Sequence, residues 1–219
     1  HIHLHETREE IAESIRQHGM RPLARLQRAG LVGPGLIGVH AVHLDPKEID
    51  LLAAHGCHVA HCPTSNMKLA SGIAPVGALL GQGVGVGLGR DGAASNNRLD
   101  LIQEMRQAAL LAKLDSADAA CLPAHQALRM ATIEGARALG LDREIGSLVP
   151  GKAADLVALR LDDWELQPCY APVSHLVYAA GREQVTHGWV AGKLRITDRK
   201  PVNFEVRTWL NRVEVWQTA

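Results

Sequence analysis

The chain has 219 residues, of which 47% are apolar, enough to bury one good core or a large domain with a small one, so a disordered protein is excluded. Its 23 basic and 23 acidic residues cancel to a formal charge of zero, and no long basic run favours nucleic acid or an anionic membrane as a partner. Because no apolar run approaches the roughly 20 residues that cross a bilayer, we expect a cytoplasmic protein with a small, nearly neutral ligand.

The first 145 or so residues alternate short β-like segments with helical ones, which is the pattern of a parallel sheet with crossover helices. Helix starts are marked by capping residues, Thr7 with Glu10 and Asp45 with Glu48, and helix ends by glycine. Strands are predicted at 1–6, 36–40, 58–62 and 84–89. Helices are predicted at 7–18, 22–29, 45–56, 75–80, 99–114 and 124–139.

The pattern changes at Gly146, where the sequence becomes rich in Gly, Val and Pro. A strand-like segment at 155–161 and a hairpin at 185–196, turning near Ala191 and Gly192, predict a small β domain. The amphipathic segment 203–217 predicts a terminal helix. We therefore divide the chain into three parts: 1–145, 146–202 and 203–219.

Each of the four predicted strands ends in a polar residue, namely Glu6, His40, His61 and Asp91. In (β/α)8 barrels the functional groups lie at these carboxyl ends, where the loops converge on one mouth. Four βα units make half of such a barrel. The predicted fold class is α/β: the C-terminal half of a (β/α)8 TIM-type barrel with part of a small β-sandwich.

The opening string His1-Ile2-His3-Leu4-His5-Glu6 places three histidines on one face of a strand, where imidazoles can ligate a divalent metal. Spacing alone leaves open which of the three ligates. A carboxylate at Glu6 can move protons while the metal activates water. Asp91 can be a second ligand and accept a proton, and His40 can hydrogen-bond the attacking oxygen or the developing oxyanion.

The alternative for each residue is an ordinary structural role. A lone strand histidine is usually packed or exposed, and His43, His55, His58 and His61 are read in this way. Asp91-Gly92 alone could be a simple turn. Four polar strand ends in succession favour a functional site over four separate structural roles.

Several motifs, taken in order, resemble the amidohydrolase superfamily and within it the branch of 5-methylthioadenosine/S-adenosylhomocysteine deaminases. They are His-Leu-His-Glu-Thr at 3–7, His-Ala-Val-His at 40–43, His-Cys-Pro-Thr-Ser-Asn-Met-Lys-Leu-Ala-Ser-Gly at 61–72, Asp-Gly-Ala-Ala-Ser-Asn-Asn at 91–97, Ala-Thr through Gly-Ala at 131–136 and Gly-Ser-Leu-Val-Pro-Gly-Lys-Ala-Ala-Asp-Leu at 146–156. Together they cover nearly the whole chain.

The resemblance implies a hydrolytic deaminase, in which a metal-activated water attacks the purine carbon that bears the amino group and ammonia is released. His3 would be a metal ligand, and Glu6 would shuttle a proton to the ring nitrogen. His40 would position the attacking oxygen, and Asp91 would be ligand and base. Glu6 and Asp91 would also contact the substrate, a purine nucleoside. Zn²⁺ is the expected metal, although Fe²⁺ or Mn²⁺ would accept the same ligands.

The chain departs from the family pattern in two ways. The His-x-His pair of the family's first strand has no counterpart, so we expect the enzyme to be larger than this chain and the isolated 219 residues to be inactive. Arg90 stands where the family usually has Thr, and a long cation there would compete for Asp91 and weaken metal binding, or its side chain would swing outward.

Two other functions remain open: an amidohydrolase of another amino- or chloro-substituted heterocycle, of guanine or triazine type, and a non-catalytic fragment that needs its missing half. A homo-oligomer is possible.

Overall fold

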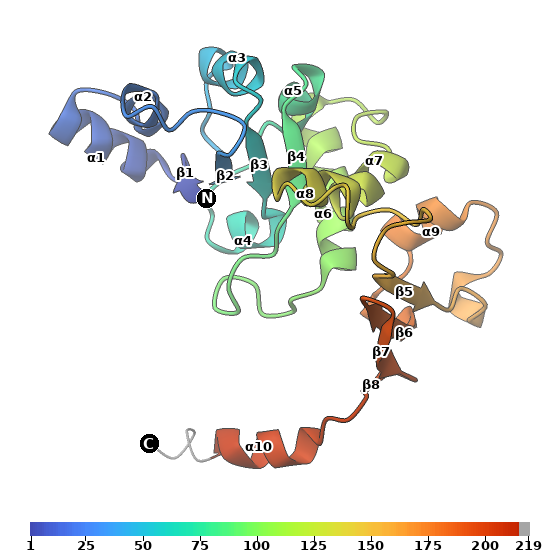
Figure 1. Ribbon diagram of the computed structural model, residues 1–219. Coiled ribbons are helices and arrows are strands. Elements are labelled where there is room, and N and C mark those ends of the chain that lie inside the picture. The colour runs from blue at the N-terminus through green and yellow to red at the C-terminus, as the bar shows by residue number, and fades with distance from the viewer. Residues whose placement is uncertain (215–219) are drawn as a thin grey trace.

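The computed structural model describes residues 1–214 and contains a four-stranded parallel sheet in the first part of the chain (Figure 1). Its strands are hydrogen-bonded in chain order: β1 (Ile2–Leu4), β2 (Ile37–His40), β3 (His58–His61) and β4 (Gly85–Leu88). The helices between and after them are α1 (Arg8–His18), α2 (Pro22–Arg28), α3 (Pro46–Ala54), α4 (Pro63–Lys68), α5 (Val76–Gly81) and α6 (Leu101–Ser116). This is half of a (β/α)8 barrel, and the predicted fold class is confirmed.

The core lies between the sheet and the helices that follow its strands. Val59 and Val86 are opposite each other in the register of β3 and β4, and both are fully buried. They belong to one apolar cluster with Leu52 of α3, Leu79 of α5 and Met105 of α6. Burial of each large apolar side chain contributes about 1.5–3 kcal/mol, so this cluster holds the strand ends in place.

The helix predicted at 124–139 is two helices, α7 (Ala124–Met130) and α8 (Ile133–Ala138), so the prediction of one continuous helix was wrong. The chain bends at Thr132, whose backbone leaves the helical region. The bend lets α8 lie against β4 at Gly87, where a Cβ atom would come within 3.0 Å of the Cα atom of Gly135. Tertiary packing of two glycines therefore decides the path of this segment.

The second sheet is antiparallel and consists of β5 (Leu156–Leu159), β6 (Val185–Val190), β7 (Lys193–Thr197) and β8 (Lys200–Pro201), in that order. The β6–β7 hairpin turns at Ala191 and Gly192, both with positive φ, as predicted. Three short helices precede β6 and were not predicted: η1 (Trp164–Leu166), α9 (Pro172–Tyr178) and η2 (Arg182–Gln184). Helix α9 packs against α6 and α7 and so connects this part of the chain to the first.

Helix α10 (Val206–Glu214) lies well away from both sheets (Figure 1). It was predicted at 203–217, of which residues 215–217 lie outside the described residues. The division of the chain at 145 and 202 stays a prediction. None of the helices within residues 1–214 has the length and apolar character needed to cross a membrane.

Candidate active site

Three side chains from separate strands meet at the carboxyl edge of the parallel sheet. His3 comes from β1, His40 ends β2, and Asp91 follows β4 by three residues. One ligand atom from each lies within 4.8 Å of the other two. The rings of His3 and His40 are edge to face, with centroids 5.1 Å apart. Imidazole nitrogen and carboxylate oxygen are zinc-type donors, so this trio could hold a divalent metal.

Two members of the trio have an unusual backbone. His40 and Asp91 have φ values of 72° and 59°, in the left-handed region that non-glycine residues seldom adopt. Such residues cost roughly 1–3 kcal/mol and concentrate at functional sites. The turn after His40 is held because the N–H of Ala41 donates to the carbonyl of Leu4, at 3.0 Å. The fold thus bends both strand ends so that their side chains approach His3.

Glu6 lies beside the trio. Its Oε2 atom is 3.6 Å from Nε2 of His40, and its Oε1 atom accepts a hydrogen bond of 3.3 Å from the hydroxyl of Ser71. The carboxylate is partly exposed, which leaves it open to a ligand in the mouth of the half-barrel. Glu6 is therefore placed where it can exchange a proton with a molecule bound next to His3 and His40.

His5 is not on the face of His3, and this expectation was wrong. Strand β1 ends at Leu4, and a φ of 53° at His5 turns its side chain into the protein. The ring is fully buried, and the backbone N–H of Leu23 donates to its Nε2 atom at 3.1 Å. Burial is the main cause of its lowered pKa. His5 packs helix α2 against the strand end, whereas His1 is exposed.

Asp91 is held by two hydroxyl groups that sequence reasoning missed. Ser95 and Ser65 donate to the same oxygen, Oδ2, at 2.6 and 2.7 Å, which leaves Oδ1 for a cation. The hydrogen bond from Ser95 is the largest cause that lowers the pKa of Asp91 to about 2. Arg90 is exposed and no ion pair joins it to Asp91, which agrees with the outward alternative and not with competition for the carboxylate.

Ser65 belongs to α4, a six-residue helix that was not predicted. The next residue, Asn66, has its Oδ1 atom 2.8 Å from Nδ1 of His40. The start of α4 is fixed by the buried carboxylate of Glu104, which accepts the N–H of Thr64 at 3.1 Å. Pro63 directly after a strand end was the available signal, since proline favours the first position of a helix.

His61, the polar end of β3, is fully buried, and neither ring nitrogen has a hydrogen-bond partner among the described residues. Burial first, and the nearby His40 second, lower the pKa of His61 to about 4, so the ring is neutral near pH 7. It does not belong to the trio of possible ligands. The structural role that the sequence indicates for His61 stays a prediction.

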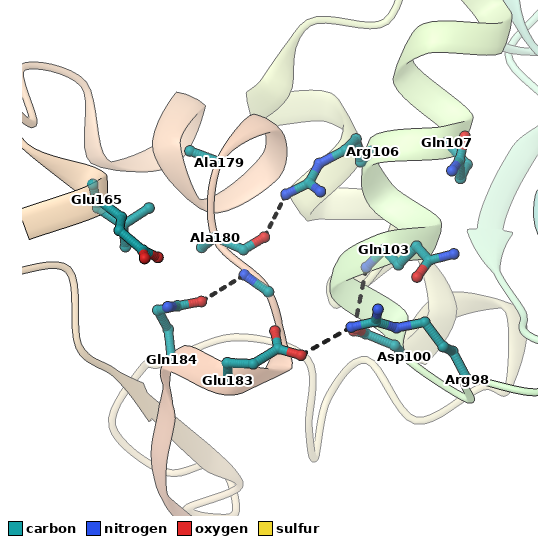
Figure 2. A pocket seen from close by; sticks show the side chains of 12 residues that line it. Arg98, Asp100, Gln103, Arg106, Gln107, Glu165, Ala179, Ala180, Glu183 and Gln184 are labelled. Carbon is teal, nitrogen blue, oxygen red and sulfur yellow. Dashed lines mark hydrogen bonds and ion pairs between the residues drawn. The ribbon is translucent and has the colours of Figure 1, made fainter. Parts of the chain in front are cut away.

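A separate pocket of about 740 Å³ lies between α6 and the segment from α9 to η2. Several of its charged groups have protein partners: Arg98 pairs with Glu183 at 2.9 Å, and Arg106 donates to the carbonyl of Ala180 (Figure 2). It holds none of the strand-end residues. The trio is thus the better candidate for chemistry.

Comparison with known proteins gives relatives that are about twice as long. A 5-methylthioadenosine/S-adenosylhomocysteine deaminase of Teredinibacter turnerae is 52% identical over 91% of this chain and 45% of the relative. A 5'-deoxyadenosine deaminase of Methanothermobacter thermautotrophicus is 47% identical over 90% of this chain and 46% of its own length. The chain spans about half the length of the curated relatives it matches.

Solved structures are also similar to this chain over about half of their own length. A crystal structure of an adenosine deaminase from Xanthomonas campestris with bound zinc matches 99% of this chain and 49% of that chain, with a TM-score of 0.97 and 48% identity. Atrazine chlorohydrolase TrzN from Arthrobacter aurescens TC1, complexed with zinc, matches 97% of this chain and 47% of that chain, with a TM-score of 0.91 and 27% identity. The model of the Amidohydrolase family matches residues 1–195. The chain belongs to the amidohydrolase family.

Proposed function

We propose that this chain carries part of the active site of a metal-dependent hydrolytic deaminase that acts on adenosine-type nucleosides of the 5'-methylthioadenosine/S-adenosylhomocysteine class. The observation that carries the proposal is the meeting of His3, His40 and Asp91 beside Glu6. The names of the relatives at 47–52% identity support the class of substrate.

The donor set fits a divalent metal, and Zn²⁺ is the proposed ion, because mixed imidazole and carboxylate ligation suits zinc and because related crystal structures hold it. His3 and Asp91 would hold the metal. When bound, zinc lowers the pKa of a coordinated water to about 7 and so supplies a nucleophile at neutral pH.

The side chains around this position have distinct roles in the proposed reaction. Glu6 takes up a proton from the attacking water and delivers it to the purine nitrogen next to the carbon under attack, and Ser71 orients its carboxylate. Asp91 stays ionised because its hydroxyl partners hold its pKa at about 2, which suits a ligand better than a base. His40 contacts the attacking oxygen through Nε2.

The proposed activity belongs to a closed barrel. In the described part of the chain, β1 and β4 are the edge strands of the parallel sheet, and each has one side without a strand partner. A closed barrel has no such edges, and open edges invite association. We therefore expect the 219 residues alone to release no ammonia and to bind zinc weakly.

The test compares this chain alone with a fusion in which it is joined to the part of the Teredinibacter turnerae relative that it does not match. Ammonia release is measured with 5'-methylthioadenosine, S-adenosylhomocysteine, 5'-deoxyadenosine, guanine and atrazine. We expect the fusion to deaminate the adenosine derivatives and the single chain to be inactive. A fusion that binds zinc but turns over only guanine or the triazine would replace the proposed substrate class, and activity of the chain alone would contradict the requirement for a closed barrel.

A further inference from the structure

His40 and Asn66 form a buried pair beside the candidate site. Both residues are only 1% exposed, and Oδ1 of Asn66 lies 2.8 Å from Nδ1 of His40. The backbone of Asn66 is held on both sides: its N–H donates to the carbonyl of Cys62 at 3.0 Å, and its carbonyl accepts the N–H of Ser71 at 2.8 Å. The backbone therefore places the amide against the imidazole, while the Nδ2 atom of Asn66 has no hydrogen-bond partner among the described residues.

This contact decides which nitrogen of His40 carries the proton. A neutral imidazole has one N–H, and an amide oxygen can only accept a hydrogen bond. With Oδ1 of Asn66 facing it, Nδ1 must be the donor, and Nε2 keeps its lone pair. That lone pair lies on the side of Glu6, whose carboxylate is 3.6 Å away.

We propose that Asn66 is a positioning residue that fixes the Nδ1–H tautomer of His40 and so presents the Nε2 lone pair to His3 and Asp91. This deepens the proposed function, on which its catalytic consequence rests. A neutral His40 held in this way accepts a hydrogen bond or a cation at Nε2, and it donates there only after it has taken up a second proton. Of the two roles expected from sequence, a hydrogen bond to the attacking oxygen suits the neutral ring, whereas donation to a developing oxyanion belongs only to the protonated ring.

The opposite orientation of the amide predicts the opposite tautomer, with Nδ2 of Asn66 donating to Nδ1 and the proton on Nε2. The trio favours the first arrangement, because one ligand atom each of His3, His40 and Asp91 lies within 4.8 Å of the others, and a lone pair at this point can be shared with a cation. A lone pair at Nε2 can also accept a hydrogen bond from the attacking water, which is the contact that the proposed function gives His40.

The tautomer can be read directly from long-range ¹H–¹⁵N correlation spectra of the metal-free 219-residue chain labelled with ¹⁵N-histidine. The spectra are recorded at about pH 8.5, two units above the ordinary pKa of histidine. Two residues supply reference patterns. We assign the proton of His5 to Nδ1, because Leu23 donates to its Nε2 and the carbonyl of His43 lies 3.3 Å from Nδ1, although the guanidinium of Arg21 is also 3.1 Å from Nδ1. His43 carries its proton on Nε2, which lies 2.8 Å from the carbonyl of Ser71.

We expect the signals of His40, assigned with a His40→Gln variant, to match the pattern of His5. Asn66→Asp, which keeps an oxygen acceptor, should preserve that pattern. Asn66→Leu, of similar size but without an acceptor, should shift His40 toward the pattern of His43. Asn97→Leu is the matched control, because the side chain of Asn97 bonds to Ala93 and Lys68 and not to His40.

A His40 pattern like that of His43 in the unaltered chain would overturn the proposal, as would an unchanged pattern in Asn66→Leu. If Asn66→Leu does not fold, the unaltered chain and Asn66→Asp still decide. The spectra need no enzymatic turnover, so their outcome is independent of whether the proposed deaminase activity is found.

Discussion

The hydroxyl of Ser65 donates to Oδ2 of Asp91 at 2.7 Å, and the hydroxyl of Ser95 donates to the same oxygen. Two neutral donors on one oxygen orient the carboxylate without cancelling its charge, so the other oxygen keeps its full capacity for a cation. We expect the double variant Ser65→Ala/Ser95→Ala to bind Zn²⁺ at least about 10-fold more weakly, as when the hydrogen-bond partners of a metal ligand are removed elsewhere.

The measurement is a competition titration of the metal-stripped chain with a chromophoric chelator. Ser116→Ala is the matched control, since its hydroxyl donates to the carbonyl of Ala112 on the far helix α6. Equal zinc affinity of the double variant and the control would show that the two hydroxyls do not support a metal ligand.

Glu6 is the predicted proton donor, and its removal should separate chemistry from metal binding. Glu6→Gln keeps the size of the side chain and a hydrogen-bond acceptor for Ser71 but cannot deliver a proton. In the active fusion we expect kcat to fall by about 10²–10⁴-fold with unchanged zinc content, the usual contribution of one general acid or base. Glu9→Gln, on the exposed first turn of α1, is the control. A loss of zinc in Glu6→Gln would instead make Glu6 a ligand.

The sequence predicted the order of strands and helices of the half-barrel because apolar runs and capping residues are local signals. Polar residues at the predicted strand ends indicated the edge of the sheet at which His3, His40 and Asp91 meet. The direction of the His5 side chain could not be predicted, because a single positive φ at the strand end turns it away from the face of His3.

Other misses have a tertiary cause. Helix α4 has only six residues, too few for a periodic pattern, yet it brings Ser65 and Asn66 to Asp91 and His40. The bend between α7 and α8 depends on a contact across more than 40 positions of sequence, between Gly87 and Gly135, and no local pattern encodes it.

Burial of His61 should make stability depend on pH. The pKa of His61 is about 4 in the folded chain, against an ordinary value of 6.5. Between these pH values the unfolded chain binds a proton at this position and the folded chain does not, so stability falls as pH drops from about 6.5 to 4, by up to about 3 kcal/mol. Below pH 4 both states are protonated, and this loss levels off.

Denaturant unfolding of the metal-free chain, followed by circular dichroism at several pH values, tests this dependence. His61→Gln should flatten the decline between pH 6.5 and 4, whereas His125→Gln, at an exposed position, should leave it unchanged. A variant without His61 that loses stability over this range as steeply as the original chain would contradict the assignment.

The contact between β4 and α8 leads to a prediction about stability, because β4 is the strand that precedes Asp91. An alanine at position 87 would place its Cβ atom 3.0 Å from the Cα atom and 3.3 Å from the nitrogen of Gly135, and backbone atoms cannot move aside as a flexible side chain can. We expect Gly87→Ala to lower the free energy of unfolding by about 1–3 kcal/mol, the usual cost of overpacking.

Gly81→Ala is the matched control, because a Cβ atom there has no neighbour within 4 Å and the residue ends helix α5. It should be neutral or stabilising by up to about 1 kcal/mol, the difference in helix propensity between glycine and alanine. Both variants are compared by thermal and denaturant unfolding of the same chain. Equal stability of the two would mean that α8 does not pack closely on β4. A loss in Gly87→Ala alone would support close packing of α8 on the strand that leads to Asp91.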